Sequence, residues 1–105
     1  MIILYLLLAL LTVKQTVGMA PLTIAPKVHL HPKFKAGTVC LIWTHEDGEG
    51  SSDCWTVEDP PRRTWDKRIV LRTQGVWYVE VTEVGQDVDG NAMAIRSDPQ
   101  RVEVF

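Results

Sequence analysis

The sequence lacks most of the features that mark enzymes, nucleic-acid-binding proteins and membrane-spanning proteins. It has no Gly-x-Ser-x-Gly motif for a nucleophilic serine and no glycine-rich phosphate-binding loop. The net charge is only −2, so electrostatics give no reason to expect binding to nucleic acid or to an anionic membrane. No apolar run reaches the roughly 20 residues that a membrane-spanning helix needs. We therefore predict a protein that is not an enzyme and uses no cofactor.

Two short patterns could bind a metal ion, but each has a simpler interpretation. His29 and His31 would lie on one face of a strand, a spacing that suits zinc or copper, yet no further ligand is tied to them. The segment 87–91 (DVDGN) opens like a calcium loop, but Asp98 stands where an EF-hand needs glutamate. Surface histidines and a hairpin turn are the favoured interpretations, so we predict no metal site.

The first 20 residues are a candidate signal peptide. Ile2–Val13 is an almost unbroken apolar run, and Gly18 and Ala20 satisfy the small-x-small rule for cleavage after Ala20. The segment before the run has no lysine or arginine, and Pro21 would hinder cleavage. Cleavage after Gly18 and an uncleaved N-terminal anchor are therefore the alternatives. We predict a signal helix within residues 1–20 and a secreted protein, attached to a membrane only if this segment is retained.

Residues 21–105 are expected to form one small domain, for which a crosslink would matter. A domain of this size buries only about 60–65% of its unfolded surface. Cys40 and Cys54 are the only cysteines, and a disulfide between them would stabilise by roughly 3 kcal/mol. Both alternate with the apolar residues of their strands, so both should point outward. They can pair if their strands are neighbours or if Cys54 lies in the loop. Two free thiols are the alternative.

Two segments with alternating apolar residues dominate the rest of the chain. GTVCLIWT (37–44) and GVWYVEVTEVG (75–85) each open on glycine and then place apolar side chains at every second position. Successive side chains of a strand point to opposite faces, so this pattern predicts two half-buried strands. Trp43 and Trp77 share the inward parity, and we expect both to fill a core. Trp55 has the same parity on a shorter strand.

Shorter segments complete the expected fold. Proline residues bracket the segment 25–30 and indicate an edge strand, whereas DPPRR (59–63) should break regular pairing. Further strands are expected at 54–58, 67–73, 92–96 and 100–105. We find no repeats and no helix-period segment after the apolar N-terminus. Six or seven short strands with turns between them predict an all-β antiparallel sandwich, preceded by the signal helix.

The segment from about Leu22 to Phe105 resembles the small secreted Ig-like domains of fungi. The resemblance rests on GTVCLIWT, DCWTVE, GVWYVEV and SDPQRVEV. The same segment is more distantly similar to the N-terminal Ig-like module of the Ser/Thr-rich, GPI-anchored cell-wall family. The resemblance implies an Ig-like β-sandwich with a non-catalytic binding or structural role at the cell wall or in the extracellular space. This chain shows no Ser/Thr-rich tail and no C-terminal hydrophobic signal, so GPI anchoring is not implied.

Trp65 differs from the other tryptophans because it lies in the proline- and arginine-rich connection PPRRTWDKR. An indole in this setting can stack on a sugar or on a partner protein, or it can fold back and cap the sandwich. Tyr78 points outward on its strand, and Arg62 and Arg63 precede Trp65. These four residues are the candidate ligand surface. The expected partner is a cell-wall polysaccharide or another extracellular protein, and a carbohydrate-binding module is the alternative function.

Overall fold

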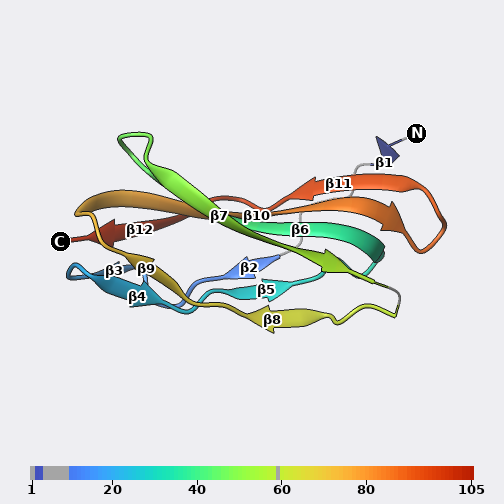
Figure 1. Cartoon of the computed structure of the whole chain (residues 1–105), viewed down its shortest axis with the longest axis horizontal. Helices are drawn as coiled ribbons and strands as arrows, with labels where there is room; N and C mark the ends of the chain where they lie inside the picture. The colour runs from blue at the N-terminus through green and yellow to red at the C-terminus, as the bar shows by residue number, and fades with distance from the viewer. Residues whose placement is uncertain (1, 4–9, 59) are drawn as a thin grey trace.

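A computed structural model describes residues 2–3, 10–58 and 60–105, and all regular structure in these ranges is β-strand. The prediction of an all-β fold is confirmed. Figure 1 shows an elongated molecule with two layers of strands, and its principal extents are 45 × 22 × 19 Å. Within these ranges there is no helix of the length and apolarity needed to cross a membrane.

The first layer is a seven-stranded sheet built around one long central strand. This strand, β10 (Gly75–Asp87), pairs antiparallel with β6 (Phe34–His45) from Trp77 to Asp87. Beyond β6 lies β7 (Gly50–Val57), which forms one edge of the sheet. On its other side β10 pairs with β11 (Ala92–Arg96) over one half and with β12 (Gln100–Val104) over the other.

The alternation of apolar residues decides which face of this sheet is buried. Val79 and Val81 are fully buried, and they lie opposite Trp43 and Leu41 of β6. Trp77 is buried as well, while Trp43 is half-buried and packs against the same core. The prediction that the alternating tryptophans face inward is confirmed. We call this buried side the inner face and the opposite side the outer face.

The second layer is a long ribbon of two to three strands that covers the inner face. Strand β4 (Leu22–Ile24) pairs with β9 (Ile69–Leu71), and β5 (Lys27–His29) pairs with β8 (Thr64–Asp66). The two pairs share one continuous register. Between them, the Lys67 amide donates to the Pro26 carbonyl at 2.9 Å. Pro26 therefore interrupts the strand without ending the ribbon.

One sequence prediction for this layer is wrong, and two of its strands were not predicted. The strand predicted at 25–30 is present as β5, but it is not an edge because it pairs with β2 (Leu11–Thr12) as well as β8, and β4 before it was not predicted. A proline lacks only the amide donor, and its carbonyl still accepts a ladder bond. The break predicted at 59–63 lies before β8, and no strand was predicted for the residues of β8 itself.

The N-terminal residues also form strands in this structure of the whole chain. Strand β1 (Ile2–Ile3) pairs with β11, β2 (Leu11–Thr12) pairs with β5, and β3 (Val17–Gly18) pairs with β12. Leu10, Leu11 and Val13 are buried in the core. The described part of the candidate signal peptide thus shows no helix, and residues 4–9 of its apolar run lie outside the described residues. Its cleavage stays a prediction.

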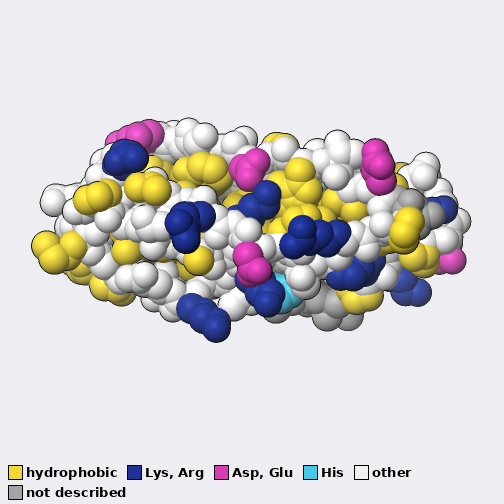
Figure 2. All heavy atoms as spheres, turned by 60° about the horizontal axis from the view of Figure 1, so that its bottom comes forward, with side chains coloured by type: hydrophobic (Ala, Val, Ile, Leu, Met, Phe, Trp, Pro, Cys, Tyr) yellow, Lys and Arg dark blue, Asp and Glu magenta, His cyan; other side chains and the backbone are white. Residues whose placement is uncertain are grey.

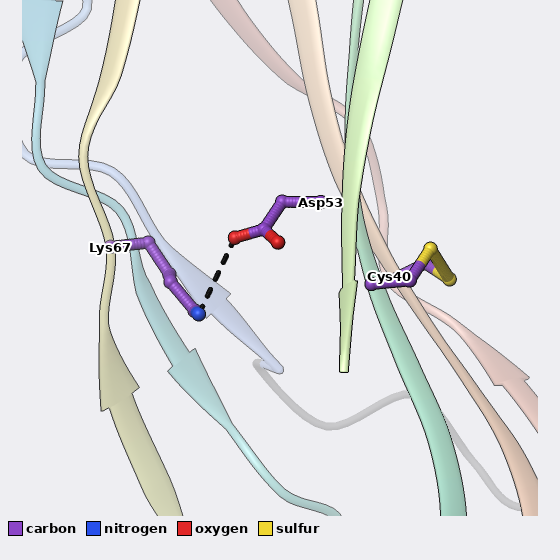
Figure 3. Close-up of a disulfide and its surroundings, with 4 residues drawn as sticks. Cys40, Asp53 and Lys67 are labelled. Atoms are coloured by element: carbon purple, nitrogen blue, oxygen red, sulfur yellow. Dashed lines mark ion pairs between the residues drawn. A yellow bond between two sulfur atoms is a disulfide. The ribbon is translucent and has the colours of Figure 1, made fainter. Parts of the chain in front are cut away.

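The two cysteines form a disulfide on the outer face. Cys40 and Cys54 are direct register partners on β6 and β7, with Cα atoms 4.1 Å apart. Both side chains point away from the core, as their parity predicted, and they meet because their strands are neighbours. Figure 3 shows the disulfide on one side of these strands and Asp53 on the other.

We expect the double variant Cys40→Ser/Cys54→Ser to unfold with a free energy lower by about 3 kcal/mol, because the crosslink restricts the unfolded chain. Urea denaturation followed by tryptophan fluorescence measures this difference. The wild type measured with a reducing agent, which breaks the disulfide, is the control. Its free energy of unfolding should approach that of the double variant. A loss below about 1 kcal/mol in both samples would contradict the stabilising role.

The buried N-terminal strand gives a second prediction, for the purified 105-residue chain. Leu11→Ala should lower the free energy of unfolding by about 2–5 kcal/mol, because it leaves a cavity in the core. Thr12→Ala, at the exposed neighbouring position, should change it by less than about 0.5 kcal/mol. Equal effects from the two variants in urea denaturation would show that this segment does not pack in the core.

Candidate functional site

Two tryptophans meet where the edges of the two layers face each other. Trp55 lies on β7, the edge of the first layer, and Trp65 lies on β8, the edge of the ribbon. Their ring centroids are 5.4 Å apart, and the ring planes are tilted by 58°. Both side chains are half-buried and pack against the core. Of the two roles considered for Trp65, the structure shows the one in which the indole folds back onto the sandwich.

A lysine and an aspartate complete this cluster. The Lys67 ammonium lies 3.9 Å from the centroid of the Trp55 ring, a cation–π contact, and 3.4 Å from a carboxylate oxygen of Asp53. Figure 3 shows the Lys67 and Asp53 side chains pointing toward each other between β7 and the ribbon. A partly exposed cation–π contact contributes about 0.5–1 kcal/mol, and an exposed ion pair contributes no more than that. We call Asp53, Trp55, Trp65 and Lys67 the tryptophan edge.

The tryptophan edge combines aromatic surface with charged groups that can exchange partners. The indole N–H of Trp55 is enclosed and has no hydrogen-bond partner among the described residues. Because Asp53 is half exposed, the ion pair with Lys67 can open at small cost. Figure 2, which turns the ribbon side forward, shows hydrophobic side chains flanked by lysine and arginine near its centre. Such a surface can stack on a ligand ring and hydrogen-bond its hydroxyl groups.

The structure does not bring the four predicted surface residues together. Tyr78 is 41% exposed on the outer face, in register with Thr44, whereas Trp65 lies beneath the inner face. Arg63 uses its guanidinium as an anchor, donating to the carbonyls of His31 at 2.8 Å and Phe34 at 3.2 Å.

Arg62 lies three residues before Trp65 in the sequence, on the same side of the molecule as the tryptophan edge. Its Nε–H donates to the Thr64 carbonyl at 2.9 Å, and the side chain is exposed. Of the predicted surface, the segment that carries Arg62 and Trp65 thus contributes to one side of the molecule, and Tyr78 contributes to the other.

A buried carboxyl group lies at the far end of β10. Glu83 is fully buried, and its Oε1 accepts the His31 amide at 3.0 Å, while Oε2 has no hydrogen-bond partner in the described part of the chain. Burial raises the pKa of Glu83 to about 7, although the His31 hydrogen bond and the charge of Arg63 act in the opposite direction. A carboxyl group in this state can hold a proton near neutral pH.

His31 is buried beside Glu83, so the expectation of surface histidines is wrong for this residue. The loop after β5 folds over the end of the sandwich, and the His31 Nδ1 accepts the Lys33 amide at 3.0 Å. Burial lowers the pKa of His31, and the nearby charges of Arg63 and Lys33 lower it further. His29 is half-buried, with Nε2 3.3 Å from the Thr12 hydroxyl.

The predicted turn at 87–91 is confirmed as a hairpin. The Asp87 carboxylate accepts the backbone amides of Asp89 and Asn91, both at 2.9 Å, so it organises the turn. Residues 10–58 and 60–105 contain no group of three or more His, Cys, Asp or Glu side chains that could hold a metal ion.

Glu83 was not singled out from the sequence, although a signal was available. It continues the inward parity of Val79 and Val81, so alternation alone places a carboxylate in the core. Comparison with known proteins gives no match among family models, curated proteins or solved structures. The function is therefore argued from the geometry of this chain.

The buried carboxyl group predicts a pH-dependent stability. The folded-state pKa of Glu83, about 7, lies above the ordinary value of about 4.3. The folded state therefore binds the extra proton between these values. Its stabilising effect is complete below about pH 4 and is lost as the pH rises toward 7. Relative to Glu83→Gln, the wild type should lose up to about 3 kcal/mol of unfolding free energy over this range.

Urea denaturation from about pH 4 to pH 8 measures this difference between wild type and variant. Glu103→Gln, a partly exposed glutamate on β12, is the control. Its difference from the wild type should vary by less than about 1 kcal/mol over the same range. A constant difference between wild type and Glu83→Gln would contradict the burial of a protonated carboxyl group.

Proposed function

We propose that this chain is a non-catalytic, secreted, Ig-like module with a binding or structural role at the cell wall or in the extracellular space. The tryptophan edge is the single observation that carries the binding role. It places two half-buried indoles, a lysine and an aspartate at the exposed boundary between two layers. Aromatic residues with a polar rim are enriched where proteins bind partners.

The strand topology supports the Ig-like assignment. In Ig folds, two antiparallel sheets pack face to face and are joined by Greek-key connections. Here β10 lies between β6 and the pair β11–β12, while β5 and β8 face them from the second layer. The disulfide joins two neighbours in one sheet, unlike the bridge of antibody domains, which joins the two sheets.

The disulfide also supports an oxidising compartment. Structural disulfides form and persist outside the cytosol, and the two cysteines of this chain are both used. Secretion through the N-terminal segment and the fungal cell-wall relationship rest on the sequence resemblance. A membrane-tethered ectodomain is the alternative if the N-terminal segment is retained. N-terminal sequencing of the exported protein distinguishes the two, because cleavage would give a chain beginning near Pro21.

A carbohydrate-binding module is the second candidate function, and the 5.4 Å indole pair is the observation that favours it. Sugar rings stack on exposed indole faces, and hydroxyl groups bond to nearby charged side chains. Trp65 and Lys67 would supply these contacts. Tyr78 would not, because it lies on the opposite side of the molecule.

Titration with soluble β-glucan and with chitin oligosaccharides, followed by tryptophan fluorescence, tests the binding role of the tryptophan edge. We expect a saturable change in the wild type that is lost in Trp65→Ala and kept in the matched control Tyr78→Ala. A loss of about 1–3 kcal/mol in binding, or roughly five- to 150-fold in affinity, is typical for removing an aromatic contact.

Two results would count against this proposal. A wild type that shows no fluorescence change and no retention on insoluble glucan or chitin would remove the carbohydrate function, leaving an extracellular protein as the partner. Binding that survives Trp65→Ala but is lost in Tyr78→Ala would place the ligand on the outer face and overturn the role of the tryptophan edge.

A further inference from the structure

The outer face of the first layer is a broad, uncovered surface. The ribbon packs only on the inner face, so the side that carries the disulfide has no second layer over it among the described residues. Val84 is 56% exposed and Tyr78 is 41% exposed on this face, although both belong to the central strand of the sheet. Exposed apolar and aromatic side chains at the centre of a sheet indicate a contact surface.

The end of the outer face around Val84 carries no charge. In the row of Val84, the register brings together uncharged side chains from four neighbouring strands, namely Thr56, Thr38, Val84 and Ala94, and the nearest charged side chain is Arg96 in the next row, opposite Thr82. Such a patch loses water at little cost, because it contains no charged group to desolvate.

The charges on the rest of the outer face neutralise one another. Arg96 contacts Glu80 through two hydrogen bonds of 2.7 and 2.8 Å, and Arg101 lies 3.3 Å from Glu103. Each acid already has a base within the same chain, so the face is neutral. A second copy of this face would meet no net repulsion and would not need to supply compensating charges.

The size of the face matches what a stable dimer needs. Strands β6 and β10 have 12 and 13 residues. At about 3.4 Å per residue and about 4.8 Å between strands, four neighbouring strands make a face of roughly 40 by 20 Å. The resulting area of roughly 800 Å² is what each partner buries in a standard protein–protein interface.

We propose that the outer face is the interface of a symmetric homodimer. A neutral, self-complementary face of sufficient size suits an isologous contact, in which the same surface is used by both copies about a two-fold axis. The uncharged end around Val84 supplies the part that loses all water, and the internal ion pairs lie in the more polar part. The tryptophan edge lies on the other side of the sheet, so both copies keep it accessible.

Sedimentation velocity of the purified full chain from about 1 to about 200 μM tests the dimer. We expect a concentration-dependent shift to twice the monomer mass. Val84→Asp should raise the dimer Kd by more than roughly tenfold, because both copies would carry a buried charge. Val70→Asp is the matched control, since Val70 is a 40% exposed valine on β9 in the other layer. It should leave the Kd within about twofold of the wild type.

A second variant tests the same interface independently, in case Val84→Asp does not fold. Arg101→Glu changes a 56% exposed side chain at the polar end of the face and leaves Glu103 beside another acid. It should also weaken the dimer, while circular dichroism stays that of the wild type. A wild type that remains monomeric at the highest concentration would overturn the proposal. So would a dimer that persists in both variants, as expected if the free edges of β7 pair instead.

Discussion

The antiparallel pairing of β6 with β10 is the interaction on which the rest of the structure depends. It runs from Phe34–Asp87 to His45–Trp77, with one irregularity near Gln86. Because residues directly opposite each other share a face, this one register decides the environment of every side chain on both strands. If β6 slipped by one residue against β10, Leu41 would turn to solvent and Cys40 would turn inward, while Val81 would stay on the buried face. The core, the disulfide and the position of Glu83 all follow from it.

The two faces of this pairing carry different chemistry. The inner face holds the apolar core, and it also carries Glu83 at one end and, through β7, Trp55 and Asp53 at the sheet edge. The outer face carries the disulfide, Tyr78 and two ion pairs. The buried carboxyl group destabilises the fold at neutral pH, and the disulfide acts in the opposite direction through the unfolded chain. A small domain can keep such a costly group because other interactions offset it.

Alternation along single strands predicted much of this fold, whereas contacts between distant segments could not be predicted. The parity of Trp43, Trp77 and both cysteines followed from local pattern, because side-chain direction in a strand is a local property. The pairing of Trp55 with Trp65 did not, since it depends on how the two layers stack. The burial of His31 depends equally on a loop folding over Glu83. Strand β8 was not predicted because the prolines before it indicate a break in pairing, although the chain forms this strand soon after them, from Thr64.

The disulfide has a mechanical consequence, because of the strand that it holds. An unsupported edge strand detaches one hydrogen bond at a time when it is pulled sideways, whereas strands sheared along their length resist together. Cys54 lies next to Trp55 on β7, and its bond to Cys40 ties that strand to β6. A load applied at Trp55 therefore passes through a covalent link into the long β6–β10 pairing. The edge strand can then bear tension without unzipping.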